Sequence, residues 1–354
     1  MNVDDRSCEV RSGEELDVKR LEEFLKDSIR GLEGNVSVEQ FPSGYSNLTY
    51  LVRISDREFV IRRPPFGRKA KTAHDMGREY RMLTALKPVF DYCPEPLVFT
   101  EDESIIGSPF YVMTRIKGII LRRDLPAGLN LTDSQMWALC ENLVDVHHEL
   151  HAVDYKSIGL GAMGKPEGYV KRQVEGWSQR YRAARTPDAP SFDYVMSWLS
   201  GEMPPDCQKP AIIHNDYKFD NVVLDSGANL KIKGVLDWEM ATIGDPLMDL
   251  GSSLGYWVQS DDSRELQAIR TLPTNRPGAL TRKQLVKRYA EKSGMTIDNF
   301  DFYYCFGLFR LAAIAQQIYF RFYHGQTKDI RFKSLIGAVH VLENTALKVV
   351  GRGF

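Results

Sequence analysis

The spacing of apolar residues changes part-way along the chain. Between Ser37 and Ile116 the apolar residues form short runs, each bounded by Gly, Pro, Asp or Asn, and this pattern predicts β-strands. One helix is predicted within this part, at about 73–86, because its apolar residues recur on a single helical face. The predicted strands are VSVEQF, TYLVRI, EFVIRR, PLVFTED and PFYVMTRI.

After Gly118 the pattern becomes helical. Thr132 and Asp133 can cap a helix whose apolar residues continue at helical spacing to Leu150. The only strands predicted in this part are VVLD at 222–225 and LKIKGVLD at 230–237, which together favour a hairpin. Further helices are predicted at about 169–184, 192–199, 282–292, 298–323 and 332–347.

These patterns predict an α+β fold with two lobes. Residues 35–117 would form a small lobe with an antiparallel sheet and one helix, and residues 118–354 a large, mostly helical lobe. Residues 1–34 would add an N-terminal helical extension, and the hinge would lie near 115–118. A cleft between two lobes is a common place for a ligand.

Composition narrows the class of protein. With 43% hydrophobic and 26% charged residues and a net charge of −1, the chain is an ordinary globular sequence without a strong global field. We therefore expect neither a nucleic-acid nor a membrane partner. The five cysteines are scattered and lack Cys-x-x-Cys spacing, so neither a disulfide framework nor a zinc site is predicted. No signal peptide or long apolar segment is evident, and a soluble, cytoplasmic protein is expected.

The segment IIHNDYKFDNVVLD, residues 212–225, places His214, Asp216 and Asn221 in a polar loop between two apolar runs. Asp237 follows the next predicted strand. Loop Asp and Asn residues are most often capping or turn residues. Phosphoryl transfer, however, needs a carboxylate beside the nucleophile and oxygen ligands for Mg²⁺. The position of each residue at the end of a strand favours this second interpretation.

These motifs resemble the aminoglycoside phosphotransferase and choline kinase superfamily, which shares the protein-kinase-like fold. The loop at 212–225 resembles its catalytic loop, and GVLDWEMATIGDPLMDL at 234–250 resembles its metal-binding motif. The resemblance is closest to kinase-like domains that are joined to some acyl-CoA dehydrogenases. The segments that carry this closer resemblance are FVIRRPP at 59–65, IIGSPFYVMTRIKG at 105–118 and GYVKRQVEGWSQRY at 168–181.

The resemblance implies a role for each residue of the catalytic loop. Asp216 matches the catalytic base, while Asn221 and Asp237 match two magnesium ligands. His214 matches a histidine that supports the loop backbone, and Asp249 resembles a buried acid that holds the loop in place. One further residue, Lys218, would meet the γ-phosphate if it is not simply a solvated surface lysine.

The same resemblance implies an ATP site in the first lobe. FPSGYSNLTYLV at 41–52 would cover the phosphates, and Arg62 stands where related kinases hold a lysine. Arginine can grip phosphate through two hydrogen bonds, with Glu79 as its partner. The hinge would offer an apolar slot and backbone hydrogen bonds to adenine. The implied ATP-binding residues are Ser43, Gly44, Ser46, Asn47, Arg62, Glu79, Met113, Thr114 and Ile116.

Two further clusters have competing interpretations. His147 and His151 have the i, i+4 spacing of a metal pair, but no third ligand is evident, and with His148 they are expected to be structural. The acceptor side would lie along the helix at 169–184 and just beyond the hinge. The candidate substrate-binding residues are Arg122, Arg172, Gln173 and Trp177.

The functional hypothesis is a MgATP-dependent kinase that phosphorylates a hydroxyl of a small molecule. The closer resemblance favours a hydroxyacyl-CoA or a related metabolite, and implies a homodimer or a functional link to an acyl-CoA dehydrogenase. An aminoglycoside kinase and a pseudokinase are alternatives; the pseudokinase is suggested by Arg62 and by Asn215, where the superfamily usually has Gly. An acyl-CoA dehydrogenase would need a flavin-binding signature, and none is visible.

Overall fold

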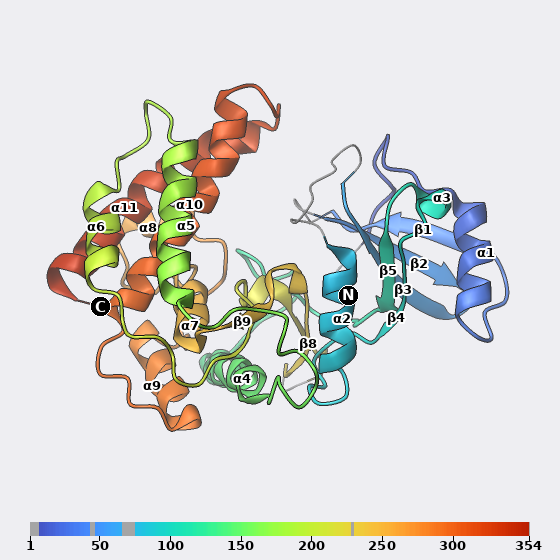
Figure 1. Ribbon diagram of the computed structural model, residues 1–354, viewed down its shortest axis with the longest axis horizontal. Coiled ribbons are helices and arrows are strands. Elements are labelled where there is room, and N and C mark those ends of the chain that lie inside the picture. Colours follow the sequence, from blue (N-terminus) through green and yellow to red (C-terminus); the bar gives the residue numbers. More distant parts are fainter. Residues whose placement is uncertain (1–6, 43–46, 66–74, 228–229, 354) are drawn as a thin grey trace.

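The computed structural model describes residues 7–42, 47–65, 75–227 and 230–353. A five-stranded antiparallel sheet in the order β1-β2-β3-β5-β4 forms one side of the molecule (Figure 1). Three helices accompany it: α1 (Val18–Ser28), α2 (Met76–Leu86) and α3 (Glu103–Ile106). The strands are β1 (Val36–Gln40), β2 (Leu48–Ile54), β3 (Arg57–Arg63), β4 (Pro96–Thr100) and β5 (Phe110–Thr114).

Alternation along β3 divides this sheet into two buried faces. Phe59 and Ile61 belong to an apolar cluster with the leucines of α1, whereas Val60 belongs to the cluster that includes α2. Because successive side chains of a strand point to opposite faces, Arg62 emerges on the same side as Val60. That side carries α2, and the alternation therefore directs a cation toward Glu79 of that helix.

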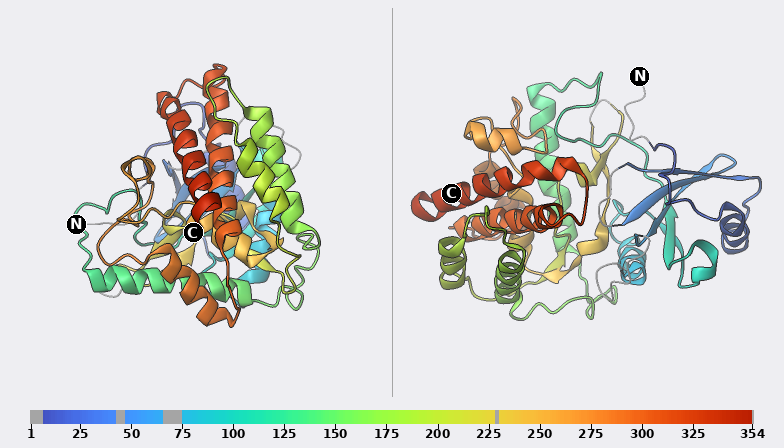
Figure 2. Two further views of the ribbon diagram at one scale, coloured as in Figure 1. Left: turned by 90° about the vertical axis from the view of Figure 1, so that its left-hand side faces the viewer. Right: turned by 90° about the horizontal axis from the view of Figure 1, so that it is seen from above.

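Helices make up most of the other side of the chain (Figures 1 and 2). The long α10 packs against α5, α7 and α11. Short 3₁₀ segments interrupt the described chain between α6 and α7 and between α10 and α11. They are η1 (Phe219–Asn221), η2 (Trp238–Met240) and η3 (Ile330–Ser334). The helices are α4 (Asp133–Ala152), α5 (Tyr169–Ala184), α6 (Asp193–Gly201), α7 (Pro246–Leu254), α8 (Arg264–Ile269), α9 (Arg282–Ser293), α10 (Asp301–Tyr323) and α11 (Leu335–Arg352).

Two small sheets frame the polar loop found in the sequence. The predicted hairpin is present as β7 (Val222–Leu224) paired with β8 (Ile232–Val235). The prediction that these were the only strands in this part was wrong, since β6 (Ala211–Ile213) pairs with β9 (Thr242–Gly244). Three-residue strands hold too few residues for alternation to reveal them.

The predicted cap of α4 is Thr132. Its hydroxyl accepts a hydrogen bond from the backbone N–H of Gln135, and the Gln135 side chain accepts one from the backbone N–H of Thr132. This reciprocal pair satisfies two N–H groups that the first helical turn leaves open. The predicted α+β class is confirmed. The limits at 34/35 and 117/118 stay predictions.

Glycine brings α7 and α10 into backbone contact. A Cβ atom on Gly307 would lie 2.0 Å from the carbonyl oxygen of Gly251, and one on Gly255 would lie 2.8 Å from the backbone of Gly307. Any side chain at these positions would force the two helices apart. The contact therefore fixes α10 relative to the segment that follows the polar loop.

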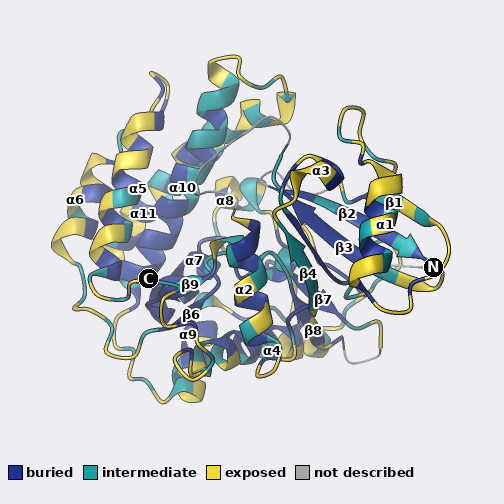
Figure 3. Cartoon of the chain, turned by 45° about the vertical axis from the view of Figure 1, so that its right-hand side comes forward, coloured by how far each residue is buried: buried dark blue, intermediate teal, exposed yellow. Residues whose placement is uncertain are grey.

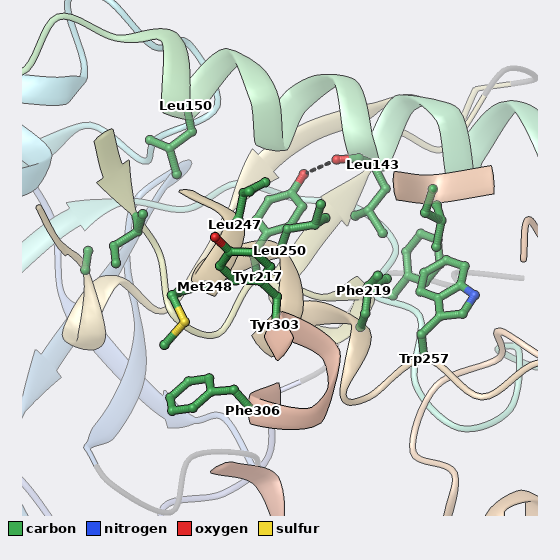
Figure 4. Close-up of a cluster of buried hydrophobic side chains, with 14 of the residues drawn as sticks. Leu143, Leu150, Tyr217, Phe219, Leu247, Met248, Leu250, Trp257, Tyr303 and Phe306 are labelled. Carbon is green, nitrogen blue, oxygen red and sulfur yellow. Dashed lines mark hydrogen bonds between the residues drawn. The ribbon is translucent and has the colours of Figure 1, made fainter. Parts of the chain in front are cut away.

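The polar loop is anchored by alternate aromatic residues. The loop joins β6 and β7, which are buried (Figure 3). Within it Tyr217 and Phe219 are buried, whereas Asp216, Lys218 and Asp220 between and beside them are partly exposed. The Tyr217 hydroxyl donates a hydrogen bond of 2.9 Å to the carbonyl of Leu143 in α4, within the apolar cluster of Figure 4. Burial of the aromatic residues thus presents the acids and the lysine on the other side of the loop.

Among the helices in the described ranges, none combines the length and the apolar character that crossing a lipid bilayer requires.

Candidate active site

The loop between β6 and β7 brings three of the predicted residues together. The Asn221 side-chain N–H₂ donates to the backbone carbonyl and to Oδ2 of Asp216, both at 2.8 Å. The Lys218 ammonium lies 2.5 Å from the same Asp216 oxygen and 3.2 Å from Oδ1 of Asp220. Burial lowers the pKa of Lys218, but the two carboxylates raise it by a larger amount. The pKa therefore lies above its ordinary value, and the lysine is a fixed cation.

His214 supports the loop rather than facing solvent. It is fully buried, its Nε2 lies 2.9 Å from the carbonyl of Leu236, and its Nδ1 lies 3.3 Å from the backbone N–H of Asp216. Burial lowers the pKa of His214, which favours the neutral ring. A neutral imidazole that donates through Nε2 and accepts at Nδ1 satisfies both contacts. The ring therefore links the loop to the segment that precedes Asp237.

Asp249, in α7, holds the backbone where the loop begins. Its Oδ2 accepts from the backbone N–H of His214 and its Oδ1 from that of Asn215, both at 2.7 Å. Asn215 has a φ of 65°, a conformation that Asn tolerates better than most residues. Its side chain also contacts Tyr169 and the Met240 carbonyl. An Asn can therefore serve where the superfamily usually has Gly.

The histidines of α4 meet the same carboxylate. Nε2 of His147 and Nε2 of His151 lie 3.0 and 3.1 Å from Oδ2 of Asp249. Asp249 is thus the possible third metal ligand that the sequence did not reveal beside His147 and His151. Together the three side chains could form a metal site. In this structure hydrogen bonds join both histidines to Asp249. Burial raises the pKa of Asp249, but the two imidazoles hold it well below its ordinary value.

Asp237 lies at the end of the β7–β8 hairpin in a left-handed conformation, with a φ of 66°. The preceding residue, Leu236, donates its backbone N–H to the carbonyl of Asn221 at 2.8 Å, which ties the two predicted metal ligands together. Burial raises the pKa of Asp237, but the neighbouring Arg62 guanidinium lowers it more. Asp237 is therefore ionised at neutral pH.

Arg62 is surrounded by three carboxylates. Its guanidinium lies 2.8 Å from Asp237, 3.3 Å from the predicted partner Glu79 and 3.4 Å from Glu239. Glu239 also accepts a hydrogen bond of 2.7 Å from the Asn47 side chain. The sequence did not identify Glu239, although its position two residues after Asp237 was a signal. These contacts join the five-stranded sheet to the segment that carries Asp237.

The other residues predicted to bind nucleotide stay predictions, and the structure gives the positions of three of them. Ser43, Gly44 and Ser46 lie outside the described residues. Met113 is buried and pairs with Val60 of β3, and the Thr114 backbone N–H donates to the Glu95 carbonyl. Ile116 lies against Gly234 of β8, where an added Cβ would meet it at 2.8 Å.

Three of the four acceptor-side candidates lie on α5, and Arg122 lies elsewhere. Arg122 acts electrostatically on Asp220, near the catalytic loop. Arg172 is exposed and donates to the backbone carbonyls of Lys165 and Glu167, where it braces the start of α5. Trp177 is buried and donates from Nε1 to Oε1 of Gln173 at 3.3 Å. The roles of all four in substrate binding stay predictions.

The donor set suits a hard divalent cation. The amide nitrogen of Asn221 is committed to Asp216, which leaves its amide oxygen available as a ligand. Asp237 adds an ionised carboxylate, and Mg²⁺ in phosphoryl-transfer sites uses one or two such oxygens together with substrate phosphates and water. Asn221 and Asp237 are therefore chemically suited to hold Mg²⁺.

Comparisons with known proteins agree with this geometry. The model of the "Phosphotransferase enzyme family" matches residues 37–279. Acyl-CoA dehydrogenase family member 10 of Mus musculus is 34% identical over 312 residues, which are 87% of this chain and 29% of that protein. Family member 11 of Gallus gallus is 32% identical over 335 residues, 92% of this chain and 42% of that protein. The chain thus spans less than half the length of these two relatives.

Solved structures show the same architecture. A candidate aminoglycoside phosphotransferase from Ralstonia eutropha has a TM-score of 0.78 and 30% identity, over 94% of this chain and 99% of that chain. Choline kinase from Cryptosporidium parvum has a TM-score of 0.67 at 12% identity, over 95% and 97% of the two chains, and this likeness concerns the fold alone. The two-lobed α+β architecture is the kinase-like fold, and this chain belongs to the phosphotransferase enzyme family.

Proposed function

We propose that this protein transfers the γ-phosphoryl group of MgATP to a hydroxyl of a small molecule. The observation that carries the proposal is the linkage of Asp216, Asn221 and Asp237 through hydrogen bonds of the catalytic loop. A base, an amide oxygen and a carboxylate held on one framework are what positioning and charge stabilisation require in phosphoryl transfer.

Each residue has a distinct task in this proposal. Asp216 orients the acceptor hydroxyl and takes its proton, while Lys218, held 2.5 Å from that carboxylate, neutralises charge on the transferred group. Bound Mg²⁺ would neutralise the phosphates, and Asn221 and Asp237 would hold it. Arg62 would exchange its contact with Asp237 for the phosphates, while Glu79 keeps the guanidinium in place.

The acceptor we propose is a hydroxyacyl-CoA or a related hydroxy acid. Support comes from the relatives named acyl-CoA dehydrogenase family members, of which this chain matches only part. An enzyme that phosphorylates a hydroxyacyl thioester and a dehydrogenase that acts on acyl thioesters would share one class of compound. We therefore also propose a functional link to such a dehydrogenase.

A protein that binds nucleotide without turnover is a second candidate. The contact that favours it is the ion pair of 2.8 Å between Arg62 and Asp237, which occupies a carboxylate proposed for the metal. The two candidates differ in a measurable way. A kinase must release this contact when MgATP binds, whereas a pseudokinase can retain it.

Two variants and two assays test the proposal. ATP consumption is measured over a panel of hydroxy acids, their coenzyme A thioesters, neutral diols and aminoglycosides, and MgATP binding is measured by thermal shift with and without EDTA. Asp216→Asn should lower turnover by about 10²–10⁴-fold, the range for loss of a general base, and leave MgATP binding nearly unchanged. Asp237→Ala should instead abolish the difference between MgATP and metal-free ATP. Full turnover in Asp216→Asn would refute its role.

A further inference from the structure

Arg310 is a buried arginine without a carboxylate partner among the described residues. Its exposed fraction is 3%. Its guanidinium donates a hydrogen bond of 3.5 Å to the sulfur of Met240 and lies 5.2 Å from the ring centre of Trp177. A thioether is a weak acceptor, and an aromatic face supplies only part of what a buried charge loses in hydration.

The contrast with another cation of the same lobe is clear. Arg282 is also largely buried, and it forms two hydrogen bonds with the carboxylate of Asp262, at 2.7 and 2.8 Å. Buried charges are normally paired in this manner. A guanidinium that the fold buries without an acid has unused capacity for a negative group from outside the chain.

The fold places Arg310 beside the catalytic loop. It lies one helical turn after Gly307, whose contact with Gly251 fixes the position of α10. Met240, which it contacts, accepts a hydrogen bond of 3.1 Å through its carbonyl from the side chain of Asn215. Met240 is 36% exposed, so the side chain that contacts the guanidinium reaches the protein surface.

Two tyrosines connect the guanidinium with the reacting groups. Arg310 acts electrostatically on Tyr169, whose hydroxyl contacts Asn215 at 3.2 Å. It acts likewise on Tyr256, whose ring lies 5.1 Å from the ammonium of Lys218. The guanidinium is therefore within electrostatic reach of side chains that contact the neighbours of Asp216, namely Asn215 and Lys218.

We propose that Arg310 is the residue that binds the anionic group of the acceptor. This assignment rests on the proposed function and narrows its substrate class to hydroxyl compounds that also carry a carboxylate or phosphate. Arg180 also lies over the indole of Trp177, 4.7 Å from the ring centre. The buried guanidinium of Arg310 disfavours a polycationic acceptor such as an aminoglycoside.

The test measures binding by calorimetry with the nucleotide site saturated with MgADP. The probes are 3-hydroxybutyrate, coenzyme A, 3-hydroxybutyryl-CoA and the neutral 1,3-butanediol. The variants are Arg310→Met, Arg310→Lys and the matched control Arg180→Met, which removes an exposed cation that also lies over Trp177. Thermal melting and MgATP binding confirm that each variant is folded.

Wild-type protein should bind at least one anionic probe more tightly than the diol. Arg310→Met should weaken that binding by about 10- to 100-fold, the usual range for a charged hydrogen bond, Arg310→Lys should retain part of it, and Arg180→Met should retain most. If the binding of free 3-hydroxybutyrate depends on Arg310, the recognised group is a carboxylate. If only the binding of coenzyme A depends on Arg310, the recognised group is a phosphate.

Three results would overturn the assignment. The first is that wild-type protein binds no anionic probe, and the second is that it binds the diol equally well. The third is that a folded Arg310→Met variant binds the anionic probe with an affinity within twofold of wild type. If Arg310→Met does not fold, Arg310→Lys and the wild-type preference over the diol decide the question. Anion binding that depends on Arg310 in a protein without ATP turnover would contradict the proposed function and leave this assignment standing.

Discussion

Replacing Asp249 by asparagine tests how the catalytic loop is held. The carboxylate is completely buried in α7 and accepts four hydrogen bonds, two from the loop backbone and two from α4. Asparagine has nearly the same shape but offers one oxygen instead of two and carries no charge. The substitution therefore changes hydrogen bonding and electrostatics with little change in packing.

The expected cost follows from the distribution of the four bonds. Oδ2 accepts from His214, His147 and His151, whereas Oδ1 accepts only from Asn215. Asparagine should therefore place its oxygen at the Oδ2 position, lose the bond to Asn215 and weaken the other three. Hydrogen bonds to charged groups contribute about 1.5–3 kcal/mol and neutral ones about half of that. We expect a loss of about 4 kcal/mol in the free energy of unfolding.

Asp245→Asn is the matched control, four residues earlier. Asp245 is also buried, but burial raises its pKa to about 6. Because its pKa is higher in the folded protein, the stability gained from protonation is lost as pH rises through 6. Its main contact is the cap to the Leu247 N–H, and asparagine caps helices as well as aspartate does. Asp245→Asn should therefore leave stability at pH 7 unchanged or raise it.

Thermal unfolding at pH 7 distinguishes the two variants. A loss of about 4 kcal/mol corresponds to a decrease of roughly 8–16 °C in Tm for domains of 150–250 residues, and less for a larger chain. Asp249→Asn should also lose ATP turnover, because the backbone that carries Asp216 is no longer fixed. Equal Tm values for Asp249→Asn and wild type would refute the reasoning. So would a control variant that is destabilised as strongly as Asp249→Asn.

Three further predictions concern packing, charge and pH. Gly307→Ala should destabilise the protein by about 1–3 kcal/mol in urea unfolding because its Cβ would overlap the backbone of α7. Gly337→Ala, which has open space around it in α11, should stabilise the protein by about 0.5–1 kcal/mol. Equal effects of the two substitutions would contradict this prediction. Arg62→Met should cost about 3–5 kcal/mol by leaving Glu79 buried and unpaired, and adding Glu79→Leu should recover part of that loss in the same assay. Burial lowers the pKa of His151 from 6.5 to about 4. The contribution of the neutral ring to the free energy of unfolding is therefore fully present above pH 6.5, and about 3 kcal/mol of it is lost as pH falls to 4. His151→Leu should flatten this pH profile.

Local patterns predicted much of the fold. The helix at 169–184 agrees with α5, and Thr132 caps α4 as its position before the helical pattern indicated. Both features depend on side chains within one or two helical turns. The pairing of β6 with β9 was missed because each strand has three residues and the partners are far apart in sequence. Alternation cannot be detected in so short a run.

The site shows the same limit. Asp216, Lys218 and Asn221 lie within six residues of one another, and the sequence placed them in one loop. The contact of Asp249 with His147 spans 102 positions, so no spacing in the sequence could reveal it. Arg310 was visible only as an interruption of an apolar segment. Its burial, and the absence of an acid beside it among the described residues, depend on how α10 packs.

Charge divides the site into two parts, and this division supports the choice of acceptor. On the nucleotide side, one guanidinium, that of Arg62, faces the carboxylates of Asp237, Glu79 and Glu239. Such an excess of acid favours a divalent cation. Next to the proposed base, Lys218 is held by the carboxylates of Asp216 and Asp220, whereas the guanidinium of Arg310 has no carboxylate partner among the described residues. A polycationic acceptor would meet repulsion there, whereas a hydroxy acid or its thioester could use its hydroxyl at Asp216 and its negative group at Arg310.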